Sequence, residues 1–256
     1  MRTRLALAAA TTLATSLFVA PVQAQDKPAL KPLDDSELSG VWGQALLDLT
    51  NTTLNGYDFS RLTLNADINL SASLSGLQLG TKGSTSDINI STLNFGRSDA
   101  TDAQRTVAIT DPYFEWVYSG SATTGDRQVV GMRIGFGGIA GEVGLLMNTV
   151  SGSLSLTTSA GQVGATGSQL TALTGCSGSC NVALNQIGGV TAGNTAGASR
   201  DFFLSILKSA VTYPAANAAL GASATAQAGF WLNWTDRLAA LNTTGTVPPN
   251  VPKIGP

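Results

Sequence analysis

The two cysteines are the first residues whose spacing could support a defined chemistry. Cys176 and Cys180 lie in the sequence Gly-Cys-Ser-Gly-Ser-Cys. A redox pair is typically Cys-x-x-Cys at a helix N-terminus, where the thiolate is stabilised. A zinc site would need two further ligands, and the chain contains no histidine. In an oxidising compartment the spacing instead predicts a disulfide between Cys176 and Cys180 that closes a small loop.

Carboxylates in the middle of the chain are the next candidates. Two carboxylates on either side of a cleft can hydrolyse a glycosidic bond, but acidic residues are more often solvated or part of turns. The chain has no Gly-x-Ser-x-Gly sequence, and the absence of histidine removes the commonest general base. We therefore predict no catalytic residue, although a carboxylate-dependent hydrolase remains a hypothesis. The carboxylates in question are Asp111, Glu115, Asp126 and Glu142.

Two further patterns could hold an ion or a phosphate. Asp99 and Asp102 share one polar loop, but the ligand spacing of an EF-hand is missing, so calcium binding stays open. The glycines of residues 135–141 resemble a phosphate loop only loosely and follow no βαβ pattern, which favours a bulged strand. No metal and no cofactor is predicted.

Four tryptophans could line a ligand surface or fill a core or an interface, which is the more frequent role of this residue. They are Trp42, Trp116, Trp231 and Trp234.

The N-terminus predicts export. Arg2 and Arg4 precede an apolar stretch over residues 5–19, and Val22-Gln23-Ala24 offers a cleavage site after Ala24. A membrane anchor would need about 20 uninterrupted apolar residues, and threonines and a serine interrupt this stretch. We expect a signal peptide over residues 1–24, a single β-rich domain over 25–246 and a Pro-rich tail over 247–256. The mature chain would lie in the periplasm, on the outer membrane or outside the cell.

Charge argues against a nucleic-acid partner. The chain has 14 Lys and Arg and 16 Asp and Glu, and removal of the signal peptide leaves 12 basic residues and a net charge of −4. The remaining basic residues are scattered singly, whereas phosphate binding requires a basic stripe. Only 12% of residues are charged, well below the usual quarter.

Alternation of apolar and polar residues predicts the elements that must position these groups. Over residues 62–74 every even position is apolar and every odd position polar, which is typical of a strand with one buried face. Residues 67–71 are echoed at 87–91, but the repeats are incomplete, which favours antiparallel strands over a solenoid. The expected fold is mainly β, an antiparallel sandwich, roll or barrel-like sheet. Further strands are predicted at 88–95, 105–109, 113–118, 128–136, 142–148 and 152–157.

The C-terminal part predicts one or two helical segments. Residues 199–211 combine a capping serine, Ser199, with apolar residues on one helical face, and Pro214 follows. Residues 220–234 alternate completely and predict a strand, although their alanine content also suits a helix. Residues 160–198 are rich in Gly, Thr and Ala and predict long surface loops. The tail is expected to be extended or disordered.

One short motif carries a resemblance. Residues 33–44 read LDDSELSGVWGQ, with a very short helix expected at 34–38. This stretch resembles the opening of secreted Gram-negative proteins that are largely uncharacterised, some of them labelled as components of a pilus system. The resemblance covers about a twentieth of the chain and implies an exported protein of the bacterial envelope.

Three functional hypotheses follow. The leading one is a non-enzymatic structural protein of the envelope or surface, pilus- or adhesion-associated, that contacts other envelope proteins or its own copies through sheet edges. The second is a periplasmic carrier of lipid or another apolar ligand, held on the apolar face of a curved sheet. The third is the carboxylate-dependent hydrolase.

Overall fold

A computed structural model describes residues 46–120, 123–175, 180–215 and 224–251. The predicted signal peptide, the predicted helix at 34–38, Trp42 and Cys176 lie outside these residues. Within the described residues there are two short 3-10 helices, η1 at Asp102–Arg105 and η3 at Leu184–Gln186. The strands are β1 Leu47–Leu54, β2 Tyr57–Leu64, β3 Asp67–Leu70, β4 Ala72–Leu79, β5 Ile88–Phe95, β6 Val107–Ser119, β7 Gln128–Thr158, β8 Gly161–Leu170, β9 Ala172–Gly175, β10 Cys180–Ala183, β11 Val190–Ala192, β12 Phe203–Leu207, β13 Val211–Thr212, β14 Thr225–Ala226, β15 Gly229–Trp234 and β16 Leu238–Ala240.

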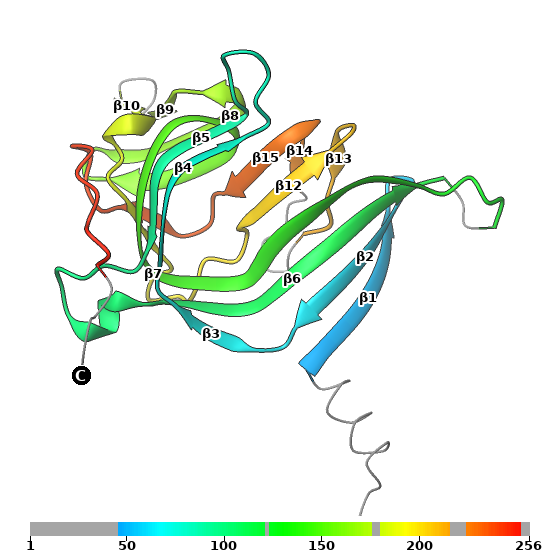
Figure 1. Cartoon of the computed structure of the whole chain (residues 1–256), viewed down its shortest axis with the longest axis horizontal. Coiled ribbons are helices and arrows are strands. Elements are labelled where there is room, and N and C mark those ends of the chain that lie inside the picture. Colours follow the sequence, from blue (N-terminus) through cyan, green and yellow to red (C-terminus); the bar gives the residue numbers. More distant parts are fainter. Residues whose placement is uncertain (1–45, 121–122, 176–179, 216–223, 252–256) are drawn as a thin grey trace, which may run out of the picture.

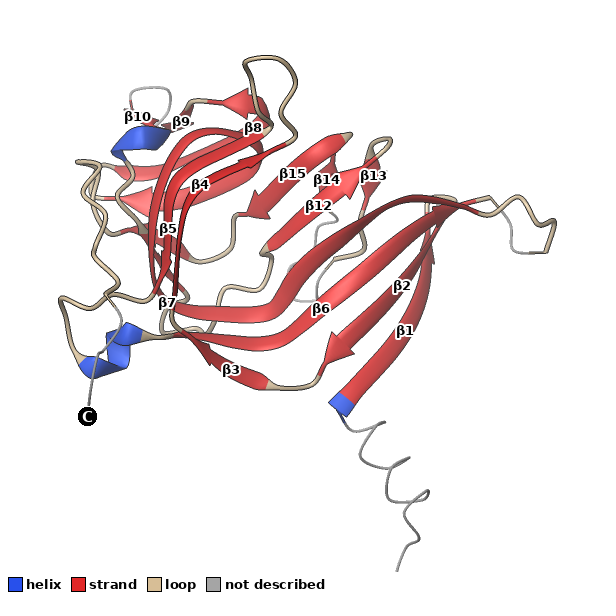
Figure 2. Ribbon diagram, in the orientation of Figure 1, coloured by secondary structure: helices blue, strands red, loops and turns tan. Residues whose placement is uncertain are grey.

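Strand β7 pairs with strands from every part of the large sheet. It is 31 residues long and pairs antiparallel with β5, β6, β8, β11 and β12, and parallel with β15 and β16. The main path of the 14-stranded sheet runs β1-β2-β6-β7-β8-β9-β10, while β13 and β14 form a separate pair. The strand colouring of Figure 2 shows how completely β structure dominates the described residues. The prediction of a mainly β, antiparallel fold is confirmed.

The strand predicted at 88–95 coincides with β5, and the other predicted strands in the middle of the chain are correct in type but too short. The three strands expected at 128–136, 142–148 and 152–157 are consecutive parts of β7, and those at 105–109 and 113–118 merge into β6. The glycines of residues 135–141 lie within β7, as their interpretation as strand requires. The conformational freedom of glycine lets a strand of this length continue from one part of the sheet to another, as at Gly141 with φ +130°.

The predicted C-terminal helix is wrong. Residues 203–207 form β12, which pairs with β7 on one side and β15 on the other. The side chains of Phe203, Ser205 and Leu207 are buried, and Ile206 between them is exposed. Pairing on both sides satisfies the backbone and overrides a helical pattern of only a few turns. No α-helix of the length predicted occurs among the described residues.

Two other predictions also need correction. Residues 160–198 contain β8, β9, β10 and β11 rather than surface loops alone, because glycines such as Gly164 and Gly175 permit close approach of neighbouring backbone. Residues 62–74 do not form one strand with a buried face. They divide among β2, β3 and β4, and the side chains of Ile68 and Leu74 are exposed.

Two regions share β7. We call β1, β2, β6, β12 and residues 128–136 of β7 the outer sheet, which curves away from the rest of the molecule (Figure 1). The closed region contains β4, β5, β8–β11, β16 and the rest of β7, and β15 joins the two regions. The closed region surrounds the main core, which includes Ile88, Ile139, Val143, Leu145, Met147, Val150, Leu154, Leu156, Leu173, Leu184, Ile187 and Leu238.

A smaller core lies on one face of the outer sheet, which we call its inner face. It joins strand residues such as Phe59, Val117 and Phe203 to Tyr213 and Ala226 of the β13–β14 segment. Within the described ranges, no helix is long and apolar enough to span a bilayer.

Candidate functional site

A row of polar side chains crosses the inner face of the outer sheet. Arg61 of β2 lies opposite Glu115 of β6, which lies opposite Arg133 of β7. Ser205 of β12 continues the row and is followed by Trp231 of β15. Residues that are directly opposite in antiparallel strands share a face, so their side chains meet. We call these five residues the polar row.

Glu115 links the two arginines. Its Oε2 accepts a hydrogen bond from Nε of Arg61 at 2.7 Å, and its Oε1 accepts one from Nε of Arg133 at 2.7 Å. Glu115 and Arg133 are 2% and 1% exposed. Because two guanidinium groups face a single carboxylate, the row carries one excess positive charge in a poorly hydrated environment.

Aromatic rings compensate part of this charge. The Arg133 guanidinium carbon lies 4.0 Å from the ring centroid of Tyr213 and 5.0 Å from that of Phe203, and that of Arg61 lies 4.3 Å from the ring of Tyr113. Such cation–π contacts stabilise a desolvated cation. Burial raises the pKa of the Tyr213 hydroxyl, so this ring stays neutral and keeps its favourable face.

Glycines on either side of Arg133 make room for the row. A Cβ on Gly135 would lie 2.4 Å from the hydroxyl of Tyr113, and one on Gly131 would lie 2.2 Å from the carbonyl oxygen of Ile206. Arg133 Nη2, the Tyr213 hydroxyl and Trp231 Nε1 are buried without a hydrogen-bond partner in the part of the chain that the structure describes. The row is therefore tightly packed, and its carboxylate is engaged by two arginines rather than poised as a base.

The opposite face of the outer sheet is apolar and open. Leu49, Leu62, Phe114, Ile134 and Leu204 are opposite one another across β1, β2, β6, β7 and β12. Leu49 is 62% exposed, Phe114 44% and Ile134 38%. We call this surface the outer apolar face; it consists of Leu47, Leu49, Leu62, Leu64, Phe114, Trp116, Val129, Met132, Ile134, Leu204 and Ile206.

The outer apolar face continues into the main core. Leu204 is half-buried against that core, and Leu232, opposite it on β15, is buried. At the same end, Phe202 stacks on Phe136 at 5.0 Å and meets the edge of Trp234 at 5.1 Å between ring centroids. One sheet face is thus covered by the closed region at β15 and uncovered from β12 to β1.

A hollow of about 590 Å³ lies on this face. It is apolar except at one edge, where the ammonium of Lys208 donates a hydrogen bond to the carbonyl oxygen of Val129 at 2.9 Å. Its lining residues are Trp116, Val129, Val130, Gly131, Met132, Ile206, Leu207 and Lys208.

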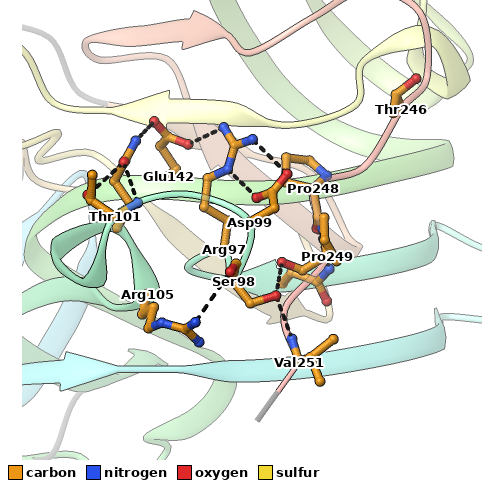
Figure 3. Close-up of polar contacts among 12 residues, drawn as sticks. Arg97, Ser98, Asp99, Thr101, Arg105, Glu142, Thr246, Pro248, Pro249 and Val251 are labelled. Carbon is orange, nitrogen blue, oxygen red and sulfur yellow. Dashed lines mark hydrogen bonds and ion pairs between the residues drawn. The ribbon is translucent and has the colours of Figure 1, made fainter. Parts of the chain in front are cut away.

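A second polar network fixes the C-terminal tail (Figure 3). Arg97 donates hydrogen bonds to both carboxylate oxygens of Asp99, at 2.7 and 3.0 Å, and to Glu142 at 2.8 Å. These bonds lower the pKa of Asp99 and raise that of Arg97. The neighbouring Ser98 donates through its backbone N–H and its hydroxyl to the carbonyl oxygen of Pro249, at 2.7 and 3.1 Å.

The tail residues up to Val251 are therefore extended and held in place. The side-chain amide of Asn250 donates to the carbonyl oxygens of Ala72 and Phe95 at 3.0 and 2.8 Å, and that of Asn94 donates to Pro248 at 3.0 Å. This network ties the tail to β4 and β5. The polar groups of this network form hydrogen bonds with one another, so the network has the arrangement of a structural contact that holds the tail in place.

The predicted site residues do not converge. Glu115 belongs to the polar row and Glu142 to the tail network, while Asp126 accepts a hydrogen bond from Thr124 at 2.6 Å in a turn. Asp102 pairs with Arg105 at 3.1 Å, and Asp99 pairs with Arg97. No cluster of three potential metal ligands occurs within the described ranges.

The tryptophans and cysteines also lie in different parts of the structure. Trp231 and Trp234 are buried, and Trp116 lies on the outer apolar face. Cys180 is opposite Gly175 in the β9–β10 hairpin, and Gly175 immediately precedes Cys176 in the sequence. The pairing places the ends of the loop close together, and the disulfide stays a prediction because Cys176 lies outside the described residues.

Sequence reasoning missed Arg61 and Arg133. The available signal was the sequence Gly131-Met-Arg-Ile-Gly135, which places an arginine between two glycines and on the opposite face from two apolar residues.

Comparison with known proteins gives no relative: no protein-family model, curated protein or solved structure matches the chain.

Proposed function

We propose that the chain is an exported, non-enzymatic structural protein of the bacterial envelope, pilus- or adhesion-associated, that is held in an assembly by its outer apolar face. The observation that carries this proposal is the uncovered apolar surface on β1, β2, β6, β7 and β12. Isolated apolar residues are normal on a protein surface, but a continuous patch of this kind marks an interaction site.

The polar row supports the same role. Charges that bridge β2, β6 and β7 on the inner face hold these strands together behind the apolar surface. A rigid sheet loses little conformational entropy when it binds, which favours a preformed binding surface. Glu115 and Glu142 are paired with arginines, and Asp126 is held in a turn. Asp111 lies in β6, apart from the other three. These positions lend no support to the hydrolase hypothesis.

The test is cell fractionation of substituted proteins. Phe114→Asp places a carboxylate in the centre of the outer apolar face and is expected to release the protein from envelope assemblies into the soluble periplasmic fraction. Asn69→Asp on exposed β3 is the matched control and should leave the distribution unchanged. Equal distribution of wild type and Phe114→Asp would contradict the proposal.

Export is part of the proposal and has its own test. Cleavage after Ala24 predicts that the mature protein begins at Gln25. Intact-mass measurement of the exported protein checks this, and a chain that retains Arg2 would be incompatible with it.

A carrier of lipid or another apolar ligand is the second candidate, because the hollow beside Trp116, Met132 and Ile206 is lined by apolar groups. It predicts that lipid copurifies with the wild type and is lost from Ile206→Asp. Solvent extraction followed by mass spectrometry distinguishes the two functions.

A further inference from the structure

The covering partner of the outer apolar face can be specified. We infer that it is a second copy of this chain, packed face to face about a two-fold axis. This inference rests on the proposed function, since it names the partner used by the same surface.

The exposed area fits a stable dimer. Six large apolar side chains on this face are each more than a third exposed: Leu47, Leu49, Phe114, Val129, Ile134 and Ile206. Together they expose on the order of 500 Å² of apolar surface, within the range of roughly 300–600 Å² of the largest apolar patch on a typical monomer, which is often a functional surface. A standard interface buries about 800 Å² per partner, of which about 60% is apolar. The exposed apolar area of this face is therefore close to the apolar area that one partner buries in a standard interface. The outer apolar face alone is large enough for such an interface.

The composition is that of an interface rather than of a lipid-binding surface. The face combines Phe114, Trp116 and Met132 with aliphatic residues, and aromatic residues and methionine are enriched at interface cores. Lys208 is the one cation among the residues that line the hollow, and its ammonium donates a hydrogen bond to the carbonyl oxygen of Val129. The predicted net charge of −4 for the mature chain opposes contact with anionic lipid.

The face carries both exposed side chains and a hollow. A two-fold contact presents the same patch twice, so a projection on one copy must meet a recess on the other. Leu49 on β1 is 62% exposed, and the hollow lies three strands away between β6 and β12, so in the proposed dimer Leu49 is assigned as the projection and the hollow as the recess. Two sheets packed about 10 Å apart would bury Leu49 of each copy against the partner's hollow.

The position of the face explains why a copy of the same chain suits it. From β15 to β1 one sheet face passes from buried Leu232 through half-buried Leu204 to exposed Ile134 and Phe114. The closed region covers one end of this face as the second layer of a core. In the dimer, the partner's outer sheet is the second layer for the remainder.

Sedimentation velocity of the purified mature protein over a wide concentration range tests the inference. The wild type is expected to sediment as a dimer. Ile206→Asp in the hollow and Leu49→Asp at the projection are each expected to raise the dimer dissociation constant by about thirtyfold or more. Asn69→Asp is the matched control and should leave the constant unchanged. Circular dichroism melts verify that all variants fold.

Two results of this experiment would overturn the inference. A wild type that is monomeric throughout, or a dimer that neither Ile206→Asp nor Leu49→Asp weakens, would do so. Flotation of the wild type, but not of Ile206→Asp, with phosphatidylcholine vesicles would identify lipid as the partner instead. Failure of the proposed function is separable: a dimer found free in the periplasm contradicts the structural role alone, and an envelope-bound monomer contradicts the dimer alone.

Discussion

The outer sheet and the closed region share β7 but distribute their side chains in opposite ways. In the closed region the apolar side chains of β7, such as Ile139 and Val143, point into a core and are buried. In the outer sheet Arg133 is the buried side chain, while Ile134 beside it is exposed. Alternation along a strand says which residues share a face, and the covering layer alone decides which face is buried.

The largest expected effect comes from removing the carboxylate of the polar row. Glu115→Gln keeps the side-chain volume but leaves Arg61 and Arg133 without a counter-charge, and should lower the free energy of unfolding by about 3 kcal/mol or more. Urea denaturation measures it. Replacing the buried pair by apolar residues, with Glu115→Leu and Arg133→Met, should cost less than the single change. A loss below about 1 kcal/mol in Glu115→Gln would mean that the row contributes little.

Two isoleucines of β7 test the contrast directly. Ile139 is 0% exposed in the main core, and Ile134, five residues earlier, is 38% exposed on the outer apolar face. Ile139→Ala should cost about 2–5 kcal/mol because it leaves a cavity. Ile134→Ala should cost less than about 1 kcal/mol at concentrations where the protein is monomeric. Equal losses in urea denaturation would show that the outer face is covered in solution.

Gly135 tests how tightly the inner face is packed. Gly135→Ala would place a methyl group 2.4 Å from the Tyr113 hydroxyl, so Tyr113 must shift beside Arg61. We expect a loss of about 1–3 kcal/mol. Gly56→Ala is a steric contrast at a site with open space, although its positive φ carries its own strain. No loss in Gly135→Ala would indicate a looser inner face than the structure has.

The smallest expected effect is a change in stability at low pH, and it comes from the Arg97–Asp99 pair of the tail network. Hydrogen bonds from Arg97 lower the pKa of Asp99. The stabilisation is therefore fully present above the unfolded-state pKa of about 3.9 and is lost as the pH falls through the lower folded-state pKa. Thermal melts of wild type and Asp99→Asn should differ slightly at neutral pH and converge in strong acid. A constant difference at every pH would exclude the ionised Arg97–Asp99 pair as its cause.

The polar row and the outer apolar face could be predicted from the sequence only in part. The sequence marks the carboxylate of Glu115 as a candidate, but its partners Arg61 and Arg133 lie 54 and 18 residues away along the chain. Pairing of β2, β6 and β7 brings them together, and no local spacing encodes such a pairing. The helix expected over residues 199–211 failed for the same reason, since two neighbouring strands decided the conformation of β12.

By itself the sequence determined that this is a β protein with few charges and period-two strands, because alternation depends only on neighbouring residues in the chain. It also determined which residues share a face within a strand, as for Tyr113, Glu115 and Val117 of β6. The tertiary structure alone decided that the buried face of the outer sheet is the one with the charged row. The inner face is covered by the β13–β14 segment and the opposite face is not, and that choice depends on residues as far apart in the sequence as Phe59 and Tyr213.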